Sequence, residues 1–405
     1  EDSGLHRLLF GREPGSDAVP ERAKIPTDDQ AAATVAALAA RGGPQVEDAG
    51  VAPLPVRPDT SDAIRTFEIG LFDRELDTAW RRTSYSALSA AAEQEPHAGV
   101  SSEPEDGERD DENLEQVIRS TEDHPELRAV ASPMAELPAG TSFGTLVHAV
   151  LETTDPTSVD LPAELRLRCA EQLARRPAGM SADELAAGLL PTLATPLGPI
   201  GAGLALRDIP VRDRLAELDF EIPLGGGDLI EDLETSVTLG DLGQLLRGLL
   251  PADDPLAGYA ERLESVGMSG QLLRGYLTGS LDAVFRLPGP RYVVADYKTN
   301  WLGADGTEPL SAWHYRPQAL NEAMAGSDYP LQALLYCVAL HRFLRWRQPG
   351  SDPRLHLGGV LYLFVRGMCG ADNPVVDGQP CGVFGWRPPA DLVIGLSDLL
   401  DRRNR

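Results

Sequence analysis

The pattern of apolar and polar positions separates an irregular front of the chain from a region of regular periodicity. Residues 1 to about 70 are rich in Ala, Pro and charge, and within them the stretch 31–40 predicts a short Ala-rich helix. From about Leu137 onward, helical and strand periodicities alternate and are separated by Gly- and Pro-containing turns. Helices that alternate with a few core strands are typical of an α/β fold.

The region of regular periodicity predicts both helices and strands. The helices, the first with Ser142 as its N-cap, are expected at 143–152, 161–175, 181–190, 239–250, 330–346 and 390–403. The strands are expected at 215–222, 277–287, 292–298 and 358–365. Pro288-Gly289-Pro290 marks a turn, so the strands on either side of it are expected to be antiparallel neighbours. Upstream, Thr83 or Ser84 is expected to cap a short helix at 85–88.

Two carboxylates and a lysine lie where these two neighbouring strands would meet. Side chains alternate along a strand with period two, so Asp282 lies on the face opposite to Leu281, Ala283 and Phe285. In the second strand Asp296 and Lys298 share a face, and the register could place Asp282 beside Asp296. Adjacent carboxylates repel unless a cation lies between them, and Mg²⁺ is commonly bound by carboxylates together with phosphate oxygens. A nearby ammonium could orient or deprotonate an attacking water, or stabilise charge on a phosphate.

The same residues have a plainer explanation. An Asp-x-Lys sequence is common, and Asp282 and Lys298 would pair equally well as a salt bridge on a solvated strand face. The composition favours the chemical interpretation, because only Lys24 and Lys298 among 36 basic residues are lysines. In a chain with such a bias toward Arg, Lys298 is expected where a planar guanidinium cannot replace a compact ammonium.

Two helical patterns add candidate residues. Gly144, His148 and Glu152 are four residues apart and share a helix face, and a neutral imidazole is a good metal ligand. A surface His followed by Glu one turn later explains this pattern equally simply. Gln332 and Tyr336 also share a face and can hydrogen-bond phosphate oxygens, although ordinary helix residues would look the same.

A basic and aromatic cluster follows Tyr336. It surrounds Trp346 and consists of His341, Arg342, Arg345 and Arg347. Charge combined with stacking suits single-stranded nucleic acid. The alternative is a solvated helix end whose cations are favoured by the helix dipole.

The charge is concentrated in the front of the chain. The formal net charge is −26; residues 1–250 hold 46 acidic and 21 basic residues (−25), and residues 251–405 hold 16 and 15 (−1). The densest acidic stretch, 103–115, predicts a flexible, solvated linker. Because phosphate binding normally requires basic surface, this chain by itself is expected to bind DNA weakly.

The remaining composition restricts the class of protein. The four cysteines, Cys169, Cys337, Cys369 and Cys381, are too sparse for a disulfide scaffold and predict cytosolic thiols. The sequence contains no run of about 18 apolar residues, so no membrane span is predicted. The chain begins Glu1-Asp2-Ser3 without a signal peptide, so it is expected to be a piece of a longer protein.

Taken in order, these segments resemble the nuclease domain at the C-terminal end of the RecB family, the exonuclease and helicase subunit of a bacterial recombination enzyme. The resembling segments are 83–86 (Thr-Ser-Tyr-Ser), 144–148 (Gly-Thr-Leu-Val-His), 279–282 (Gly-Ser-Leu-Asp), 296–303 (Asp-Tyr-Lys-Thr-Asn-Trp-Leu-Gly), 329–336, 339–345 and 358–367. They extend over most of residues 72–405. The resemblance implies three parts: 1–71, a partly disordered tail of the preceding helicase region; 72–125, the Thr-Ser-Tyr-Ser segment with the acidic linker; and 126–405, the nuclease domain.

The resemblance also implies a fold and a site. The fold would be a restriction-endonuclease-like PD-(D/E)XK core, a mixed central sheet flanked by helices. His148, Asp282, Asp296 and the backbone carbonyl of Tyr297 would hold Mg²⁺, with Lys298 assisting catalysis. The family's Gln-x-x-x-Tyr motif falls on Gln332 and Tyr336, and Arg342 and Arg345 are the expected DNA-binding cations. A further catalytic acid aligns loosely with Glu217, with Glu221 as the alternative.

The implied function is a Mg²⁺-dependent exodeoxyribonuclease module in the cytoplasm. It would act on single-stranded DNA fed from a duplex end, beside RecC-like and RecD-like subunits and the helicase portion of its own parent chain. A non-catalytic nuclease-fold scaffold and a small-molecule metallohydrolase are the alternatives. Some relatives in the superfamily hold an iron–sulfur cluster on four cysteines, but no Cys-x-x-Cys pair occurs here, so no cluster is expected.

Overall fold

The computed structural model describes residues 4–12, 19–20, 23–43, 81–84, 124–224, 237–303 and 308–401 of the 405-residue chain. The chain divides into two compact units, Glu1–Arg74 and Glu75–Arg405. The first unit contains α1 (Gly4–Phe10) and α2 (Asp28–Ala39). A capping box of Thr27 and Gln30 starts α2. The Ala-rich helix predicted at 31–40 is therefore confirmed, and it begins three residues earlier than predicted.

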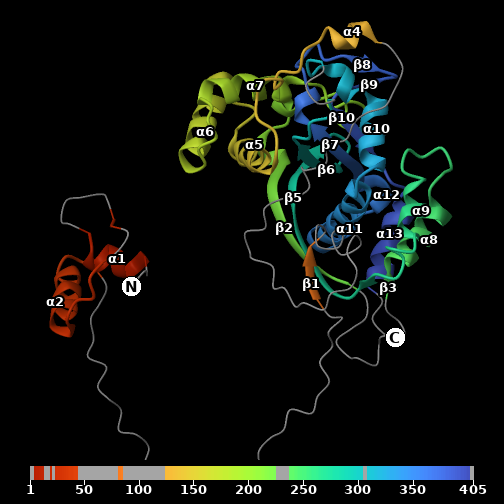
Figure 1. The fold of residues 1–405 in the computed structure, drawn as a ribbon. Coiled ribbons are helices and arrows are strands. Elements are labelled where there is room, and N and C mark those ends of the chain that lie inside the picture. The colour runs from red at the N-terminus through yellow and green to blue at the C-terminus, as the bar shows by residue number, and fades with distance from the viewer. Residues whose placement is uncertain are drawn as a thin grey trace, which may run out of the picture. The chain divides into compact units, whose positions relative to one another are not determined.

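The second unit is built on a six-stranded mixed sheet (Figure 1). Its strands are β1 (Arg81–Ser84), β2 (Arg214–Pro223), β5 (Gly275–Leu287), β6 (Arg291–Lys298), β7 (Leu357–Phe364) and β10 (Val383–Trp386). The order is β1-β5-β6-β7-β10, and β2 also pairs with β5. Strands β5 and β6 are antiparallel across the Pro288–Pro290 turn, as predicted. The β6–β7 and β1–β5 pairs are parallel, whereas β2–β5 and β7–β10 are antiparallel.

Helices cover both faces of this sheet (Figure 1). One face carries α5 (Thr141–Thr153), α6 (Leu161–Arg175) and α7 (Ala182–Ala194). The other face carries α8 (Leu239–Leu249), α9 (Tyr259–Leu263), α10 (Pro317–Ala325), α11 (Tyr329–Arg347) and α13 (Ala390–Leu400). The two apolar cores share the sheet, because alternate residues of β6 and β7 point into opposite cores.

Shorter elements complete the unit. They are α4 (Pro125–Arg128), α12 (Pro353–His356), and the two-residue strands β3 (Val237–Thr238), β4 (Leu272–Leu273), β8 (Val375–Val376) and β9 (Gln379–Pro380). No helix in the described part of the chain is long and apolar enough to cross a membrane.

The crossover helix α11 positions much of the site. It connects the parallel strands β6 and β7, and its residues are buried without a break from Tyr329 to His341. The surrounding core explains why this helix is apolar on nearly all sides rather than amphipathic. Because α11 returns antiparallel to both strands, its N-terminal end lies beside the C-terminal end of β6.

Most predicted elements are confirmed, with some corrections. Gly140 rather than Ser142 is the N-cap of α5, since the helix already begins at Thr141. Thr83 and Ser84 belong to strand β1, and the helix that one of them is expected to cap, at 85–88, lies outside the described residues. Leu281 packs in the α11-side core, while Ala283 and Phe285 pack in the α5-side core.

This break in alternation coincides with an irregularity in the neighbouring strand. Glu217 of β2 has a φ of 47° and drops out of an otherwise continuous ladder with β5. On the other side of β5, pairing with β6 ends at Ala283. Strand β5 therefore has irregular partners on both sides at the level of Asp282, and the period-two rule does not hold there.

Candidate active site

The acidic candidates lie at one level on three adjacent strands. Ala283 pairs with Ala295 in the β5–β6 ladder, so Asp282 and Asp296 are the next residues across from each other. The strands separate at this point, and Asp282 Oδ2 accepts a hydrogen bond from the backbone N of Tyr297 at 2.8 Å. Both carboxylates are buried, with 6% and 3% of their residue surface exposed. The predicted proximity of the two aspartates is thus found in a closed environment.

His148 contacts the first of these carboxylates, Asp282. It lies on α5, its Nδ1 is 3.2 Å from Asp282 Oδ2, and its ring packs edge-on against Tyr297 with centroids 6.0 Å apart. Of the other two residues on this helix face, Gly144 is buried and Glu152 is exposed. Contact with a carboxylate fixes the orientation of an imidazole, which is the usual support for a metal-binding histidine.

Asp296 and Lys298 form a buried ion pair. Lys298 Nζ lies 2.9 Å from Asp296 Oδ2, and their side chains are 5% and 4% exposed. Burial raises the pKa of Asp296 to about 6, and the nearby Asp282 adds to the rise, while Lys298 and His148 oppose it. The plainer explanation of the sequence placed Asp282 and Lys298 on a solvated strand face, whereas both residues are buried.

Gln332 and Tyr336 hydrogen-bond to each other within the buried face of α11. Gln332 Nε2 donates to Tyr336 Oη at 3.2 Å, and Tyr362 of β7 donates to Gln332 Oε1 at 2.9 Å. The Tyr336 ring packs edge-on against Phe220 of β2, with centroids 6.0 Å apart. A Cβ at Gly279 would come within 2.8 Å of that Phe220 ring, so the glycine of the Gly-Ser-Leu-Asp segment gives the aromatic ring its space.

The two acidic alternatives on β2 have different surroundings. Glu217 Oε2 accepts a hydrogen bond from Ser280 Oγ at 2.7 Å, two residues before Asp282. Glu221 instead forms an exposed ion pair with Arg82 of β1, at 2.7 Å. Of the two, Glu217 lies nearer the level of the buried aspartates.

Arg342 and Arg345 differ in a similar way. Arg342 donates to Ser397 Oγ, to Ser397 O and to Pro223 O at 2.8–3.1 Å, and so fastens α11 to α13 and to the end of β2. Arg345 is exposed, beside Trp346, which is 72% exposed. The structure thus gives Arg342 an internal packing role that the sequence did not indicate.

Residues that the sequence did not suggest surround the predicted ones. Tyr329 lies 4.2 Å below the Lys298 ammonium, and Tyr362 lies 5.7 Å from it. Arg366, fully buried at the end of β7, donates to the carbonyls of Thr299 and Met134, both at 2.8 Å, and of Pro138. A polar group within or next to an almost wholly apolar strand was the available signal for both Tyr362 and Arg366.

The donor chemistry of the site fits a divalent cation. Two buried carboxylates and an imidazole are ligands of the type that Mg²⁺ and related ions accept. The pKa of Asp296 is raised chiefly by burial and further by the neighbouring Asp282, and a bound cation would oppose both effects. Among the described residues, no group of three or more His, Cys, Asp or Glu side chains is placed to hold a metal ion. As arranged here, the Lys298 ammonium compensates Asp296.

The four cysteines are free thiols that lie in three different parts of the core. Cys169 lies in the α5-side core, Cys337 in the α11-side core, and Cys381 in a small third cluster against which Cys369 packs. Burial raises the pKa of Cys169, Cys337 and Cys381 to about 12. Thiols with such pKa values stay protonated and unreactive at neutral pH.

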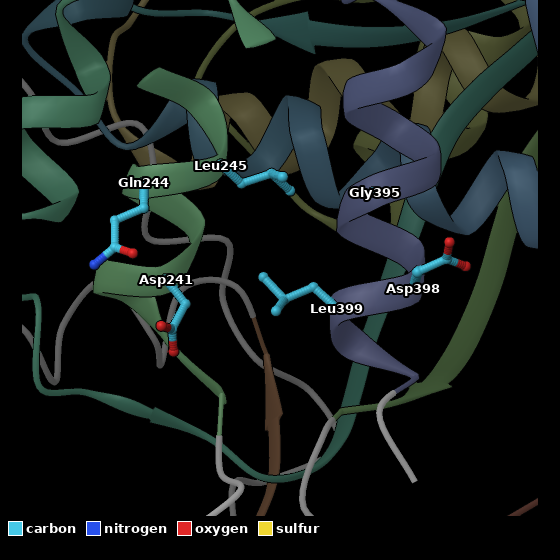
Figure 2. A pocket seen from close by; sticks show the side chains of 6 residues that line it. All are labelled: Asp241, Gln244, Leu245, Gly395, Asp398 and Leu399. Atoms are coloured by element: carbon cyan, nitrogen blue, oxygen red, sulfur yellow. The ribbon is translucent and has the colours of Figure 1, made fainter. Parts of the chain in front are cut away.

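A surface cavity of about 370 Å³ lies between α8 and α13 (Figure 2). Its lining consists of Asp241, Gln244, Leu245, Gly395, Asp398 and Leu399. The Asp241 carboxylate also accepts hydrogen bonds from the N and Oγ1 of Thr238, which caps α8. None of the predicted site residues lines this cavity.

Comparison with protein families identifies the class of protein to which the chain belongs. Residues 114–380 match the model of the PD-(D/E)XK nuclease superfamily, and the chain belongs to that superfamily. The expected PD-(D/E)XK core with a mixed sheet flanked by helices is therefore confirmed.

Within this superfamily, the chain is similar to RecB subunits of the RecBCD enzyme. The chain is 53% identical over 407 residues to the RecBCD enzyme subunit RecB of Mycolicibacterium smegmatis, and 52% identical over 418 residues to that of Mycobacterium tuberculosis H37Rv. Each match covers 99% of this chain and 36% of the relative. Escherichia coli RecB is 32% identical over 267 residues, which is 65% of this chain and 19% of that protein. The resemblance to RecB is confirmed, and the chain spans about a third of the length of its mycobacterial relatives.

Proposed function

We propose that this chain is the Mg²⁺-dependent DNA nuclease module of a RecB-like helicase–nuclease. The observation that carries the proposal is the buried cluster in which His148 contacts Asp282 and Lys298 contacts Asp296, at one level of the adjacent strands β5 and β6 of a PD-(D/E)XK sheet. A purely structural role would not require four ionisable groups with at most 9% exposed surface in one place.

Each residue of the cluster has a proposed role. His148, Asp282, Asp296 and the Tyr297 carbonyl would hold the cation. A divalent cation in such a site neutralises charge on the scissile phosphate and makes a water more acidic. Lys298 would place its ammonium near the phosphate or the attacking water. Glu217 is the proposed additional acid, since it lies across from Asp282.

DNA would be guided to this cluster by neighbouring residues. Gln332 and Tyr336 are the proposed phosphate contacts, through an amide and a hydroxyl that add no charge. Arg342 and Arg345 remain proposed DNA-binding cations, with Arg345 the more exposed of the two.

The wider function rests on the RecB relatives. The parent protein would process double-strand ends in the cytoplasm for recombinational repair and degrade linear foreign DNA. RecC-like and RecD-like subunits, and a helicase portion of the same parent chain, would deliver single-stranded DNA as the substrate. The three-part division at 71/72 and 125/126 belongs to this proposal, and strand β1 shows that the middle part also supplies a strand to the sheet.

A non-catalytic scaffold is the competing proposal. A docking module derived from a nuclease has no need of an intact cluster, yet Asp282, Asp296 and Lys298 are all present here. We favour the nuclease for that reason.

End-labelled single- and double-stranded DNA, incubated with the chain in Mg²⁺ or in EDTA, tests the proposal directly. Cleavage that needs Mg²⁺ is expected in the unmodified chain and in Asp219→Asn, a control at an exposed carboxylate on β2. Loss of cleavage is expected in Asp296→Asn and Lys298→Gln. If neither substitution reduces cleavage, the site is wrongly assigned; if the unmodified chain never cleaves, the scaffold becomes the better proposal.

A further inference from the structure

The ammonium of Lys298 has both a carboxylate and aromatic rings among its neighbours. On one side is the Asp296 carboxylate, with Nζ and Oδ2 2.9 Å apart. On another is the Tyr329 ring, whose centroid lies 4.2 Å from Nζ, with the Tyr362 ring centroid at 5.7 Å. Both distances are within the range in which the electron-rich face of an aromatic ring attracts a cation. The lysine side chain is 5% exposed, so water contributes little to holding this charge.

The two tyrosines are themselves held in place. Their rings stack, with centroids 5.6 Å apart and planes 28° apart. Tyr329 Oη donates to Asn300 Oδ1 at 3.1 Å, just beyond the end of β6. Tyr362 Oη lies within hydrogen-bond distance of Tyr329 O at 3.0 Å and of Gln332 Oε1 at 2.9 Å.

The strand register brings this pair to the site. In the parallel β6–β7 ladder, Tyr362 is the register partner of Asp296. Tyr329 is the first residue of α11 and therefore lies at the helix end nearest the C-terminal end of β6. One residue from β7 and one from α11 thus meet beside the lysine.

We propose that Tyr329 and Tyr362 are positioning residues for Lys298, forming an aromatic pocket that holds its ammonium in one place beside Asp296. This inference rests on the proposed nuclease function, because it assigns Lys298 a role in the reaction. The ring faces supply a second attraction beside that of the carboxylate, so the ammonium is held from more than one direction. A lysine held in this way has a defined position relative to a substrate phosphate.

The pocket also gives the Gln332–Tyr336 pair a second role. Gln332 is joined to Tyr362 by one hydrogen bond and to Tyr336 by another. A phosphate contact at Gln332 or Tyr336 is therefore connected to the ring that faces Lys298. The proposed DNA contacts and the aromatic pocket thus belong to one hydrogen-bonded network.

The first test removes the ring's electrostatic attraction without changing its shape. In the full 405-residue chain, Tyr329 is replaced by Phe and then by phenylalanines carrying one, two and three fluorines, which progressively weaken the negative face of the ring. Mg²⁺-dependent cleavage of single-stranded DNA is measured for kcat and KM. The same series at Phe285, buried in the α5-side core, is the matched control.

We expect kcat to fall stepwise with fluorination at position 329, while KM for DNA and all values in the Phe285 series stay nearly constant. A kcat that is the same for every fluorinated variant at 329 overturns the proposal. Tyr329→Leu, which has no ring face, should be slower than Tyr329→Phe; equal rates also count against it.

The second test needs no activity. The chain contains just two lysines, so ¹³C-lysine NMR gives two ε-methylene signals, and Lys24 provides an internal reference. Ring currents should move the Lys298 signal upfield of the Lys24 signal, and Tyr329→Leu should remove the shift. Coincident lysine signals in the unmodified chain overturn the pocket. Absence of cleavage by an unmodified chain with an upfield Lys298 signal would refute the nuclease function and leave the aromatic contact in place.

Discussion

Glu217 of β2 lies directly across from Asp282 of β5, since Ala216 pairs with Ala283 and Leu218 with Leu281 on either side of them. Glu217 also has a left-handed backbone, with φ of 47°. For a side chain other than glycine this conformation costs on the order of 1 kcal/mol. Strained backbone of this kind persists where the surrounding structure enforces it, often at functional sites.

Replacing Glu217 with Gly should therefore separate stability from activity. The change relieves the strain, so the free energy of unfolding should rise by up to about 1 kcal/mol. The loss of the hydrogen bond from Ser280 to Glu217 reduces this gain. Removing the acid should slow Mg²⁺-dependent cleavage by roughly 100-fold or more. Denaturant titration and a cleavage assay measure the two effects.

Ala202→Gly is the matched control, because Ala202 has φ of 57° in a turn after α7. It should gain similar stability and leave cleavage unchanged. Ser280→Ala measures the contribution of the lost hydrogen bond separately. Full activity in Glu217→Gly would remove Glu217 from the site and direct attention to Glu221.

The raised pKa of Asp296 predicts a dependence of stability on pH. Its pKa is 3.8 in the unfolded reference and about 6 in the folded chain, chiefly because of burial. A raised pKa means that the folded state holds the proton more tightly, so this contribution to stability is full below about pH 4 and is lost as the pH rises through 6. The loss amounts to about 3 kcal/mol.

Urea unfolding in EDTA between pH 4 and pH 8 measures this effect. The difference in unfolding free energy between the unmodified chain and Asp296→Asn should change over that interval, since Asn does not titrate. Adding Mg²⁺ at pH 8 should restore stability to the unmodified chain more than to the variant. A pH-independent difference between the two proteins would show that Asp296 titrates normally.

How far the sequence predicted this site depends on the range of the interactions involved. Asp296 and Lys298 share a face because alternation along a strand is local, and the Pro288–Pro290 turn brought Asp282 to the same level. His148 and Glu217 lie far away in the chain: helical spacing made His148 a candidate, and only the family resemblance connected both residues with the aspartates. The aromatic neighbours of Lys298 could not be predicted from local alternation. Tyr329 belongs to the crossover helix α11 and Tyr362 to the parallel strand β7, and only the packing of these elements brings them next to the lysine.

The same reasoning accounts for the elements that were missed. Strand β1, Arg-Arg-Thr-Ser, has no apolar alternation, and it is a strand because it pairs in parallel with the first residues of β5. The contacts of Arg342 with Ser397 and Pro223 depend on how α13 packs against α11. A basic helix end looks identical in sequence whether its cations meet solvent, DNA or another helix.

Arg366 should be among the most sensitive positions in the chain. Its guanidinium donates to carbonyls of the segment before α5 and to Thr299 after β6, and it faces the rings of Phe143 and Trp301. It thereby connects the helix that carries His148 to the strand that carries Asp296. Arg366→Met leaves several buried carbonyls without donors and should lower the free energy of unfolding by on the order of 3 kcal/mol.

Thermal unfolding measures that loss, and Arg354→Met is its control. Arg354 forms an ion pair with Asp391 in which both side chains are about 60% exposed, so its loss should cost at most about 1 kcal/mol. Arg366→Lys keeps the charge but cannot reach the same set of carbonyls. Its loss of stability should therefore lie between those of Arg366→Met and Arg354→Met. Equal unfolding temperatures for the Arg366→Met and Arg354→Met variants would refute this stabilising role of Arg366.

Arg345 and Trp346 lie at the opposite end of α11 from Gln332. Thirteen residues separate Gln332 from Arg345, which is about 20 Å along a helix. The far end is also marked by a hydrogen bond from Tyr292 Oη at the start of β6 to Gln348 Oε1. Any DNA contact made there is therefore remote from Lys298 and can influence only strands long enough to reach both places.

Arg345→Gln combined with Trp346→Ala should leave cleavage of very short oligonucleotides unchanged. With longer single strands the double variant should raise KM several-fold without changing kcat, because charge and stacking contribute to binding alone. The salt dependence of KM should also become shallower, as one cation is removed. Arg347→Gln alone is a partial control that keeps the exposed indole. A fall in kcat on short oligonucleotides would place Arg345 or Trp346 in the reaction itself and contradict the arrangement of α11 described above.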